Sequence, residues 1–344
     1  MRTVQIANHK IGRGQSVFII AEIGYNFNRL EEAKASIDAA MACGVNAVKF
    51  QTFRAETLTS RYTDFPDEAG GTNQFDEFKR YELSEESHRV LFEYATQKGM
   101  VVFSTPAYYD DVELLERVGI PAYKIGSDDL TNLPFIEYIA AKRRPIIFST
   151  GMADLSEVDE AYRTICGTGN DQIVILQCVS NYPIRDFRMV NLRVIESYRR
   201  AFDVPIGFSD HTVGYSCAVA AVSLGASVIE KHFTIDKALD APDAFFSADP
   251  KEMKALVQAV REVEDALGTP VKMPTPSEVK MRSETRKSVL ARRKIQAGEI
   301  LKPDMIIVKR PGTGIPPKLQ HFIFGRHVKH NIEADRPITL EMLE

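Results

Sequence analysis

The sequence lacks any run of about eighteen apolar residues, the length at which a helix could cross a bilayer, so no membrane span is expected. It also lacks an excess of positive charge. The 344 residues carry a formal net charge of −4, which predicts no nucleic-acid partner. Residues 1–14 contain no continuous apolar segment, so we expect no secretory signal peptide.

Cysteine is scarce as well. The four residues Cys43, Cys166, Cys178 and Cys217 are scattered without paired spacing, which argues against a disulfide framework and favours reduced thiols. The hydrophobic fraction of 44% and the charged fraction of 26% are ordinary for a globular protein. Together these observations predict a cytoplasmic, soluble enzyme.

Eight short apolar, β-rich runs recur along the first three-quarters of the chain, with helix-period segments between them. They lie at residues 17–24, 47–53, 100–105, 122–127, 145–150, 173–178, 205–210 and 227–233. Eight strands alternating with helices predict a (β/α)₈ TIM barrel over residues 1–268. A doubly wound sheet is the alternative. It is disfavoured because the turn after the first run, "EIGYNFN", has no G-x-G-x-x-G pattern.

The chain changes character after residue 268. Residues 269–286 hold three prolines and mixed charges, which indicates a linker. Residues 287–344 contain a weak repeat, in which "KIQAGEILKPDMI" is echoed 37 positions later by "NIEADRPITLEML". Two similar halves predict a compact, pseudo-symmetric β-rich module. Because so small a module has a thin core, we expect it to dock on another surface.

Polar residues lie in or just after the carboxyl end of every predicted barrel strand, where barrel enzymes carry their active sites. These residues are Glu22, Lys49, Gln51, Ser104, Thr105, Lys124, Ser127, Asp128, Asp129, Ser149, Thr150, Gln177, Ser180, Asn181, Tyr182, Ser209, Asp210, His211, Glu230 and His232. Taken singly, a Ser or Thr at a strand end is more often a helix cap, and a barrel histidine is more often structural. Their convergence at all eight ends favours a functional site.

Two kinds of chemistry are indicated. Lys49 and Lys124 lie inside strands, where an unpaired ammonium is costly, so they predict a bound phosphate or carboxylate. His211 and His232 end adjacent strands and suit a divalent transition metal, with small oxygen ligands completing its shell. Glu22 and Glu230 are candidate carboxylates beside it, since the eighth strand closes the barrel against the first.

The strings "AEIG", "VKFQTF", "FSTP", "KIGS", "STGM", "QCVSNYP", "GFSDHTVG" and "IEKHFT" resemble the sialic acid synthase family, which includes N-acetylneuraminate and legionaminate synthases. Its members condense phosphoenolpyruvate with an N-acetylated hexosamine to a nine-carbon 2-keto sugar acid. The stretch "SVLARRKIQAGEILKPDMIIVKRPGTG" resembles that family's antifreeze-like (SAF) domain. The resemblance covers nearly the whole chain.

The resemblance implies a role for each matching residue. His211 and His232 would hold Mn²⁺, with Mg²⁺ or Co²⁺ as alternatives, and Glu22, Asp243, Lys49 and Lys124 would be catalytic. Phosphoenolpyruvate would be bound by Lys49, Gln51, Thr105, Lys124, Ser127, Ser149, Ser180, Tyr182 and Ser209. The sugar would contact Asp129, Asp243 and Arg310. Arg310 would come from the C-terminal module of the other subunit in a domain-swapped homodimer.

The implied reaction begins with attack of phosphoenolpyruvate C3 on the metal-polarised sugar aldehyde. Water then adds at C2, and phosphate leaves by C–O cleavage. Two departures from the family pattern leave the sugar open. "YNFN" (25–28) stands where many members have "NHNG", and "KIGSDD" stands for "KIGSGE", so that Asp129 replaces a glutamate. Both are expected to face the sugar. The candidate substrates are N-acetylmannosamine and a 2,4-diacetamido-trideoxyhexose, the latter giving a legionaminate- or pseudaminate-type acid.

Two other functions compete with this interpretation. A metal-dependent barrel hydrolase would fit the histidines, but that class usually carries a denser His/Asp cluster, and two lysines within strands are hard to explain in it. A non-catalytic carbohydrate-binding protein would fit residues 287–344, but not the polar strand ends of the barrel.

Overall fold

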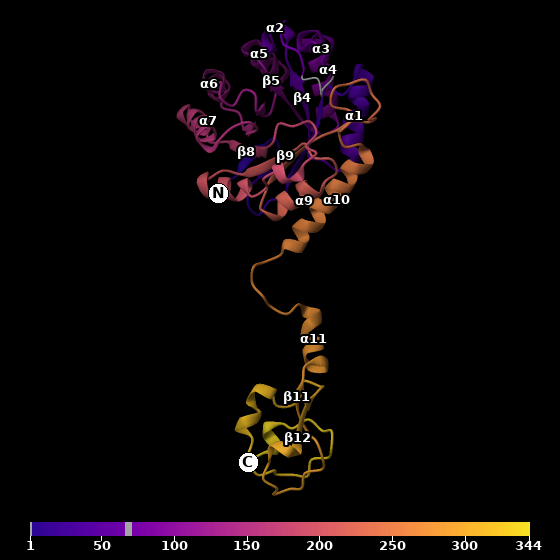
Figure 1. The fold of residues 1–344 in the computed structure, drawn as a ribbon, viewed down its shortest axis with the longest axis vertical. Coiled ribbons are helices and arrows are strands. Elements are labelled where there is room, and N and C mark those ends of the chain that lie inside the picture. The colour runs from indigo at the N-terminus through magenta and orange to yellow at the C-terminus, as the bar shows by residue number, and fades with distance from the viewer. Residues whose placement is uncertain (1, 66–70) are drawn as a thin grey trace. The chain divides into compact units, whose positions relative to one another are not determined.

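The computed structural model describes residues 2–65 and 71–344. It divides the chain into two compact units, residues 1–268 and 269–344 (Figure 1). Within these described residues, no helix is long and apolar enough to cross a membrane.

The first unit is built around a closed barrel of eight parallel strands. In barrel order the strands are β3 Phe18–Gly24, β4 Ala47–Thr52, β5 Val101–Pro106, β6 Tyr123–Ile125, β7 Ile146–Ser149, β8 Ile173–Cys178, β9 Ile206–Asp210 and β10 Val228–His232. The last strand pairs with the first, which places His232 directly opposite Glu22. This closure confirms the predicted TIM barrel, and it brings all eight carboxyl ends to one mouth.

Helices connect the strands and cover the outside of the barrel (Figure 1). They are α1 Leu30–Cys43, α2 Ala55–Leu58, α3 Gln74–Arg80, α4 Glu85–Gln97, α5 Tyr109–Val118, α6 Leu133–Ala141, α7 Leu155–Gly167, α8 Val194–Ala201, α9 Ser216–Ser223 and α10 Pro250–Leu267, with a 3₁₀ turn at Phe187–Met189. Local sequence fixes several starts. Asp154 with Glu157, and Asp249 with Glu252, form reciprocal capping boxes on α7 and α10. These caps satisfy backbone N–H groups that the first helical turn leaves unpaired.

A short hairpin closes the barrel at the end opposite the mouth. Strands β1 Val4–Ile6 and β2 His9–Ile11 pair antiparallel, and Val4, Ile6 and Ile11 are buried in the same core as the barrel strands. The hairpin lies at the amino ends of β8 and β9, because Gln5 N–H donates to Gln172 Oε1 and Arg2 N–H donates to Asp203 O. This hairpin was not predicted from the sequence.

The second unit begins with helix α11 Pro276–Thr285, which lies inside the segment predicted as a linker and buries no residue. Its module contains β11 Ser288–Ala291 and β12 Ile306–Lys309, with 3₁₀ turns at Pro303–Met305, Pro317–Phe322 and Leu340–Met342. The two halves of the sequence repeat meet at its centre. Ile295 and Ile332 occupy matching repeat positions, and each donates its N–H to the other's carbonyl at 2.9 Å.

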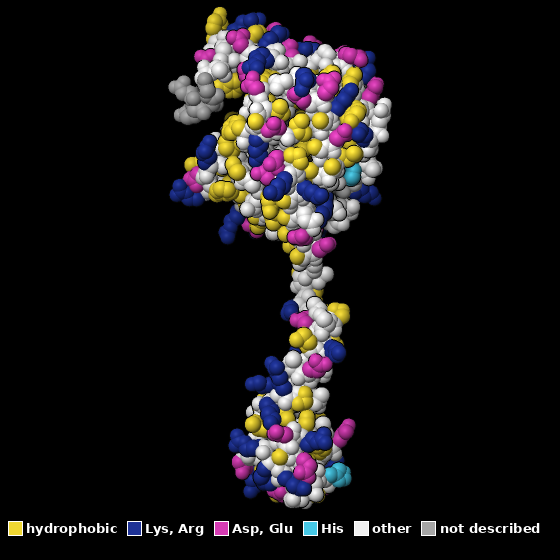
Figure 2. All heavy atoms as spheres, turned by 90° about the vertical axis from the view of Figure 1, so that its right-hand side faces the viewer, with side chains coloured by type: hydrophobic (Ala, Val, Ile, Leu, Met, Phe, Trp, Pro, Cys, Tyr) yellow, Lys and Arg dark blue, Asp and Glu magenta, His cyan; other side chains and the backbone are white. Residues whose placement is uncertain are grey.

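Charge is divided unequally between the two units. Residues 286–344 contain twelve Lys and Arg against six Asp and Glu, a net charge of +6. Since the whole chain carries −4, residues 1–285 carry −10. Figure 2 shows Lys and Arg side chains spread over the visible face of the module. The small unit is therefore a basic body on an otherwise acidic chain.

The closeness of the barrel strands makes Gly207 on β9 sensitive to substitution. A Cβ at this position would lie 2.6 Å from Val228 O and 2.5 Å from Leu176 Cδ2, so the neighbouring strands would have to move. We expect Gly207→Ala to lower the free energy of unfolding by about 3 kcal/mol, the upper end of ordinary overpacking. Gly167→Ala, at the end of α7 with open space around the new Cβ, is the control. It should be neutral or stabilise by up to about 1 kcal/mol. Equal unfolding midpoints in urea for the two variants would contradict this account.

Candidate active site

An ion pair between β3 and β4 lies at the barrel mouth. Lys49 Nζ is 2.8 Å from Glu22 Oε2, and both side chains are almost fully buried. The pair is held on both sides, since Gln51 Nε2 donates to Glu22 Oε1 at 2.9 Å and Lys49 Nζ donates to Thr105 Oγ1 at 3.1 Å. Four of the predicted site residues therefore form one hydrogen-bonded group.

A second buried group joins the opposite strands of the barrel. Lys124 Nζ donates to Ser149 Oγ at 2.7 Å and lies 3.7 Å from Glu230 Oε1. Ser209 Oγ donates to the same Glu230 oxygen at 3.2 Å. Glu230 also links the two groups, because its Oε1 is 4.0 Å from Lys49 Nζ.

The two lysines are thus paired inside the protein, which corrects the sequence argument that their burial requires an external anion. Burial tends to lower the pKa of Lys49, but the carboxylates of Glu22 and Glu230 outweigh it and raise that pKa. The pKa of Lys124 is lowered, chiefly by burial, although Glu230 opposes the shift. We call Glu22, Lys49, Lys124 and Glu230 the axial cluster. Because it sets two carboxylates against two ammonium groups, its net charge is close to zero.

Hydrogen-bonding groups without charge converge beside Lys124. Ser127 Oγ accepts from Gly151 N–H at 2.9 Å. Ser180 Oγ is buried and has no hydrogen-bond partner among the described residues. A Cβ on Gly151 would collide with Ser180 Oγ and lie 2.9 Å from Ser127 Oγ, so only glycine leaves this space open. Two hydroxyls around an open space next to an ammonium group can receive a phosphate or carboxylate.

The two histidines meet on the other side of the mouth, with ring centroids 5.3 Å apart. His211 Nδ1 lies 2.8 Å from the carbonyl oxygen of Val179. Since a carbonyl only accepts, Nδ1 carries the proton and Nε2 keeps its lone pair in the neutral ring. His232 Nδ1 is buried without a hydrogen-bond partner among the described residues. Burial, followed by the nearby charge of His211, holds the pKa of His232 well below its usual value.

Asp243 and Tyr182 surround the histidines. Asp243 Oδ2 is 3.4 Å from His232 Nδ1, and burial together with Glu22 raises the pKa of Asp243 to about 7. The Tyr182 ring lies over His211, with centroids 4.2 Å apart, and meets His232 edge-on at 5.9 Å. Because Tyr182 is 51% exposed, it forms the outer wall of this side.

The two remaining predicted sugar contacts are Asp129 and Arg310. Asp129 follows β6 and accepts a hydrogen bond from Asn132 Nδ2 at 3.1 Å. Burial, and then Asp128, raises its pKa to about 6. Arg310 belongs to the second unit, where it directly follows β12.

The stretch at 25–28 is only partly as predicted. Phe27 is buried and packs edge-on against Phe50, with ring centroids 6.0 Å apart. It belongs to the hydrophobic core rather than to the mouth, which corrects the expectation for this residue. Tyr25 does belong to the site. Burial raises its pKa well above the usual value, and the charges of Asp243, Tyr182 and Glu22 add to the shift.

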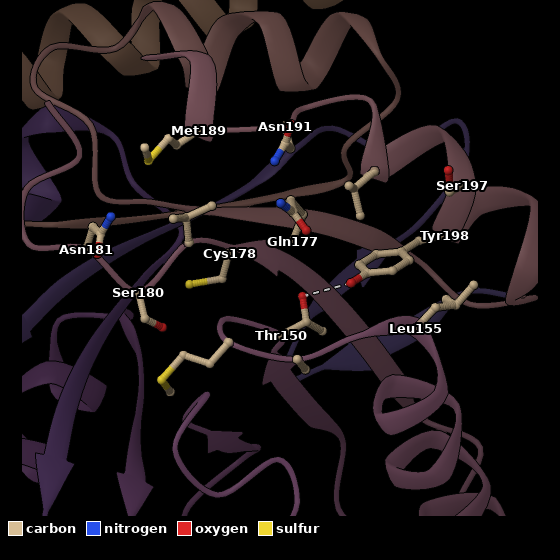
Figure 3. A pocket seen from close by; sticks show the side chains of 14 residues that line it. Thr150, Leu155, Gln177, Cys178, Ser180, Asn181, Met189, Asn191, Ser197 and Tyr198 are labelled. Carbon is tan, nitrogen blue, oxygen red and sulfur yellow. Dashed lines mark hydrogen bonds between the residues drawn. The ribbon is translucent and has the colours of Figure 1, made fainter. Parts of the chain in front are cut away.

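A cavity of about 570 Å³ opens beside the Ser180 hydroxyl, between the loops after β7 and β8 and helix α8 (Figure 3). Ser180 and Cys178 are common to the cavity and the mouth. Three of its other polar side chains, those of Thr150, Gln177 and Tyr198, are hydrogen-bonded within the protein. Tyr198 donates to Thr150 Oγ1 at 3.1 Å, and Gln177 Nε2 donates to Val190 O at 3.3 Å. None of the described residues that line this cavity is charged, so the axial cluster and the two histidines lie outside it.

Sequence reasoning missed Gly151 and the position of Cys178. Burial raises the pKa of the Cys178 thiol, but His211, Lys124 and Ser127 around it outweigh burial and lower that pKa. Cys178 thus lies near Lys124, Ser127 and His211 at once. Its place as the last residue of an apolar strand was the only signal in the sequence.

Comparisons with known proteins decide the family. Residues 36–272 match the NeuB family, and residues 286–344 match the SAF domain. The N,N'-diacetyllegionaminic acid synthase of Legionella pneumophila is 38% identical over 343 residues, covering 97% of this chain and 96% of that protein. The chain belongs to the NeuB family.

Other NeuB-family members make different acids. The human N-acetylneuraminate-9-phosphate synthase is 37% identical over 346 residues, covering 97% of this chain and 94% of that protein. A crystal structure of the N-acetylneuraminic acid synthetase of Leptospira borgpetersenii in complex with citrate has a TM-score of 0.73 and 32% identity, covering 81% of this chain and 95% of that one. This NeuB-family chain is accordingly a synthase of the nonulosonic acid type, and the predicted family and SAF domain are confirmed.

The paired lysine of this NeuB-family barrel leads to a stability prediction. Lys49→Met leaves Glu22 as a buried carboxylate without its cation, which should lower the free energy of unfolding by about 3–5 kcal/mol. Adding Glu22→Gln to that variant should restore most of the loss. Lys237→Met is the control, since Lys237 pairs with Glu252 at 2.6 Å on the surface, where a pair contributes about 0–1 kcal/mol. If Lys49→Met unfolds at the same urea concentration as Lys237→Met, Lys49 does not stabilise a charged Glu22.

Proposed function

We propose that this protein condenses phosphoenolpyruvate with an open-chain N-acetylated amino sugar, releasing a nonulosonic acid and phosphate. One observation carries the proposal: two buried lysines, the Ser127–Gly151–Ser180 group and the His211–His232 pair face a single barrel mouth. Lysines and hydroxyls can bind a small substrate that carries both a phosphate and a carboxylate, and the histidines can hold a cation that polarises a carbonyl electrophile. The products named for the similar synthases support the same reaction class.

The donor set fits a divalent cation, which we propose to be Mn²⁺, with Mg²⁺ or Co²⁺ as alternatives. His232 has a buried ring nitrogen without a hydrogen bond, and His211 keeps Nε2 available because Nδ1 is used by Val179. Across residues 2–65 and 71–344, no group of three or more His, Cys, Asp and Glu side chains could hold a metal. The two histidines would therefore leave positions for substrate or water oxygens. A bound cation would supply Lewis-acid polarisation of the sugar aldehyde.

Charge balance favours the same assignment. Glu22 and Glu230 already face Lys49 and Lys124, so the axial cluster has little net positive charge to offer an anionic substrate. A cation on the histidines would make the mouth electropositive. The lysines and hydroxyls would then orient the phosphate and carboxylate by hydrogen bonds as much as by charge.

The protein's own side chains would orient the reacting carbon atoms and transfer the protons. Lys49, Lys124 and the serine hydroxyls hold phosphoenolpyruvate so that its C3 faces the aldehyde carbon, which forms the new C–C bond. Glu22, fixed by Lys49 and Gln51, accepts the proton of the water that adds at C2. The tetrahedral centre then breaks its C2–O bond to phosphate, and its new C2 hydroxyl gives its proton to the leaving phosphate as the ketone forms. The former aldehyde oxygen takes the water proton held by Glu22 and becomes a hydroxyl of the product, and Asp243, beside His232, would contact the sugar.

The identity of the sugar depends on Asp129. Its carboxylate is one methylene shorter than that of the glutamate usual in the family, a retreat of about 1.5 Å. A 2,4-diacetamido-2,4,6-trideoxyhexose would fill the space that this leaves, whereas N-acetylmannosamine would leave room for a water. A legionaminate-type product is thus proposed alongside N-acetylneuraminate.

Phosphate release tests the function. Purified protein with Mn²⁺ should release phosphate from phosphoenolpyruvate only when an N-acetylated amino sugar is present, and the bridging ¹⁸O of labelled phosphoenolpyruvate should appear in the phosphate. Removing metal with EDTA should abolish turnover, and Mn²⁺ should restore it. Comparing kcat/KM for N-acetylmannosamine and the diacetamido sugar identifies the substrate. Phosphate release without any sugar would favour a hydrolase, and sugar binding without release would favour a binding protein.

We also propose that the enzyme is a domain-swapped homodimer, in which the module of one subunit supplies Arg310 to the other subunit's mouth. The opposite charges of the two units, +6 for residues 286–344 and −10 for the rest, support an attraction between module and barrel. Residues 269–275 could span about 23–25 Å when extended, and the ten-residue helix α11 adds about 15 Å, so the module need not dock on its own barrel. Arg310 would donate charge-assisted hydrogen bonds to the sugar.

Mixed subunits distinguish this arrangement from docking on the same chain. His211→Ala and Arg310→Ala should each be nearly inactive alone. In a swapped heterodimer, both defects fall in one site and the other site is intact, so exchange of subunits should restore up to half of the wild-type rate per heterodimer. Native mass spectrometry measures the heterodimer fraction. Heterodimers without recovered activity would show that each module serves its own barrel.

A further inference from the structure

A second buried ion pair lies on the outer face of the barrel, behind the histidines. Side chains alternate along β10, so Glu230 and His232 point to the barrel interior, while Lys231 between them points outward. Lys231 Nζ is 2.9 Å from Asp210 Oδ2, and the two side chains are 4% and 0% exposed. Lys231 and Asp210 are also direct neighbours in the pairing of β10 with β9. The reaction proposed above uses neither residue.

This pair is bonded to the segment that carries His211. Lys231 Nζ donates a second hydrogen bond, to the backbone oxygen of Thr212, at 2.7 Å. Asp210 Oδ1 accepts from Thr212 N–H at 2.9 Å and from Thr212 Oγ1 at 2.7 Å. Both residues that flank His211 are therefore fixed by the same two buried side chains.

His211 is held from the inner side as well. Its carbonyl oxygen accepts from Ile184 N–H at 3.0 Å, and its Nδ1 donates to Val179 O at 2.8 Å. Val179 and Ile184 belong to the loop after β8. The outer pair fixes the backbone of residues 210–212, and the loop fixes the direction of the ring.

Stability alone does not explain a fully buried lysine and aspartate. Removing two charges from water costs several kcal/mol per ion, and apolar residues of similar volume are often as stable or more so. The distinctive property of this pair is that its bonds end on the backbone and side chain of Thr212. Such bonds specify one conformation of the turn, which packed apolar side chains would leave less defined.

We propose that Lys231 and Asp210 are positioning residues, which set the affinity of the His211–His232 site for a divalent cation by fixing the turn 210–212. The inference rests on the proposed cation site. It assigns to these two residues a role in the site that they do not touch. Groups that orient metal ligands typically change metal affinity 10–100-fold when they are replaced.

Metal titration tests the inference without relying on turnover. Lys231→Met alone would leave Asp210 as an unpaired buried charge, so the double variant Lys231→Met/Asp210→Asn is used. Its asparagine oxygen can still accept from Thr212, which protects folding, while the ion pair and the bond to the Thr212 carbonyl are lost. The control is Ile229→Ala, since Ile229 is also fully buried on the outer face of β10, and its partner in the pairing with β9 is Phe208.

Free Mn²⁺ is measured by electron paramagnetic resonance during titration of metal-stripped protein, and ¹⁴N modulation of the bound signal reports histidine coordination. We expect Mn²⁺ affinity to fall at least 10-fold in the double variant and less than 2-fold in Ile229→Ala, with comparable losses of Tm. The ¹⁴N modulation should weaken only in the double variant. Equal affinities in the two variants would overturn the positioning role.

His211→Ala separates failure of this inference from failure of the proposed site. If His211→Ala abolishes Mn²⁺ binding while the double variant binds as tightly as wild type, the cation site stands and the positioning role is wrong. If the unmodified chain does not bind Mn²⁺, or if His211→Ala binds it as wild type does, the proposed cation site fails and the inference fails with it.

Discussion

The ion pair between Glu22 and Lys49 is the interaction on which the barrel mouth depends. It lies where the first and second barrel strands end, and it is almost fully buried. Because Glu230 lies within 4.0 Å of Lys49 and 3.7 Å of Lys124, the charges of four strands are coupled into one cluster. None of these groups can change its charge without affecting the others, so the mouth is a rigid and nearly neutral platform.

That neutrality determines what the surrounding groups must contribute. A neutral cluster can orient an anion through hydrogen bonds, but it cannot repay the loss of the anion's hydration by charge alone. The open space between Ser127, Gly151 and Ser180 offers hydrogen bonds, and the His211–His232 pair offers a place for positive charge. The three features are complementary, since each supplies something that the others lack.

Sequence reasoning could predict the barrel and most of the mouth because both follow from periodic patterns. Eight apolar runs fixed the strands, and strand ends in such a barrel necessarily share one edge. Sequence reasoning failed where the outcome depends on which buried side chains form ion pairs with each other. Nothing in the sequence says that Lys49 faces Glu22, so a lysine inside a strand was expected to need an external anion. Phe27 was similarly misplaced, because a residue in a mouth loop can turn back into the core, as it does against Phe50.

Strand β10 shows a further limit of predicting functional residues from the ends of strands. Glu230 and His232 point to the barrel interior, where polar side chains are noticed as candidates for a site. The same alternation directs Lys231 outward, where a charged residue would ordinarily be solvated. In this fold the outer face is covered, and Lys231 is buried against Asp210 and Thr212. One strand thus presents two polar faces, of which one lines the barrel mouth and the other is bonded to the turn that bears His211. Because β10 and β9 are adjacent, the distance from Lys231 to the turn is fixed by strand pairing itself. The precision with which His211 is placed therefore derives from the closed barrel, through an ion pair that faces away from the chemistry.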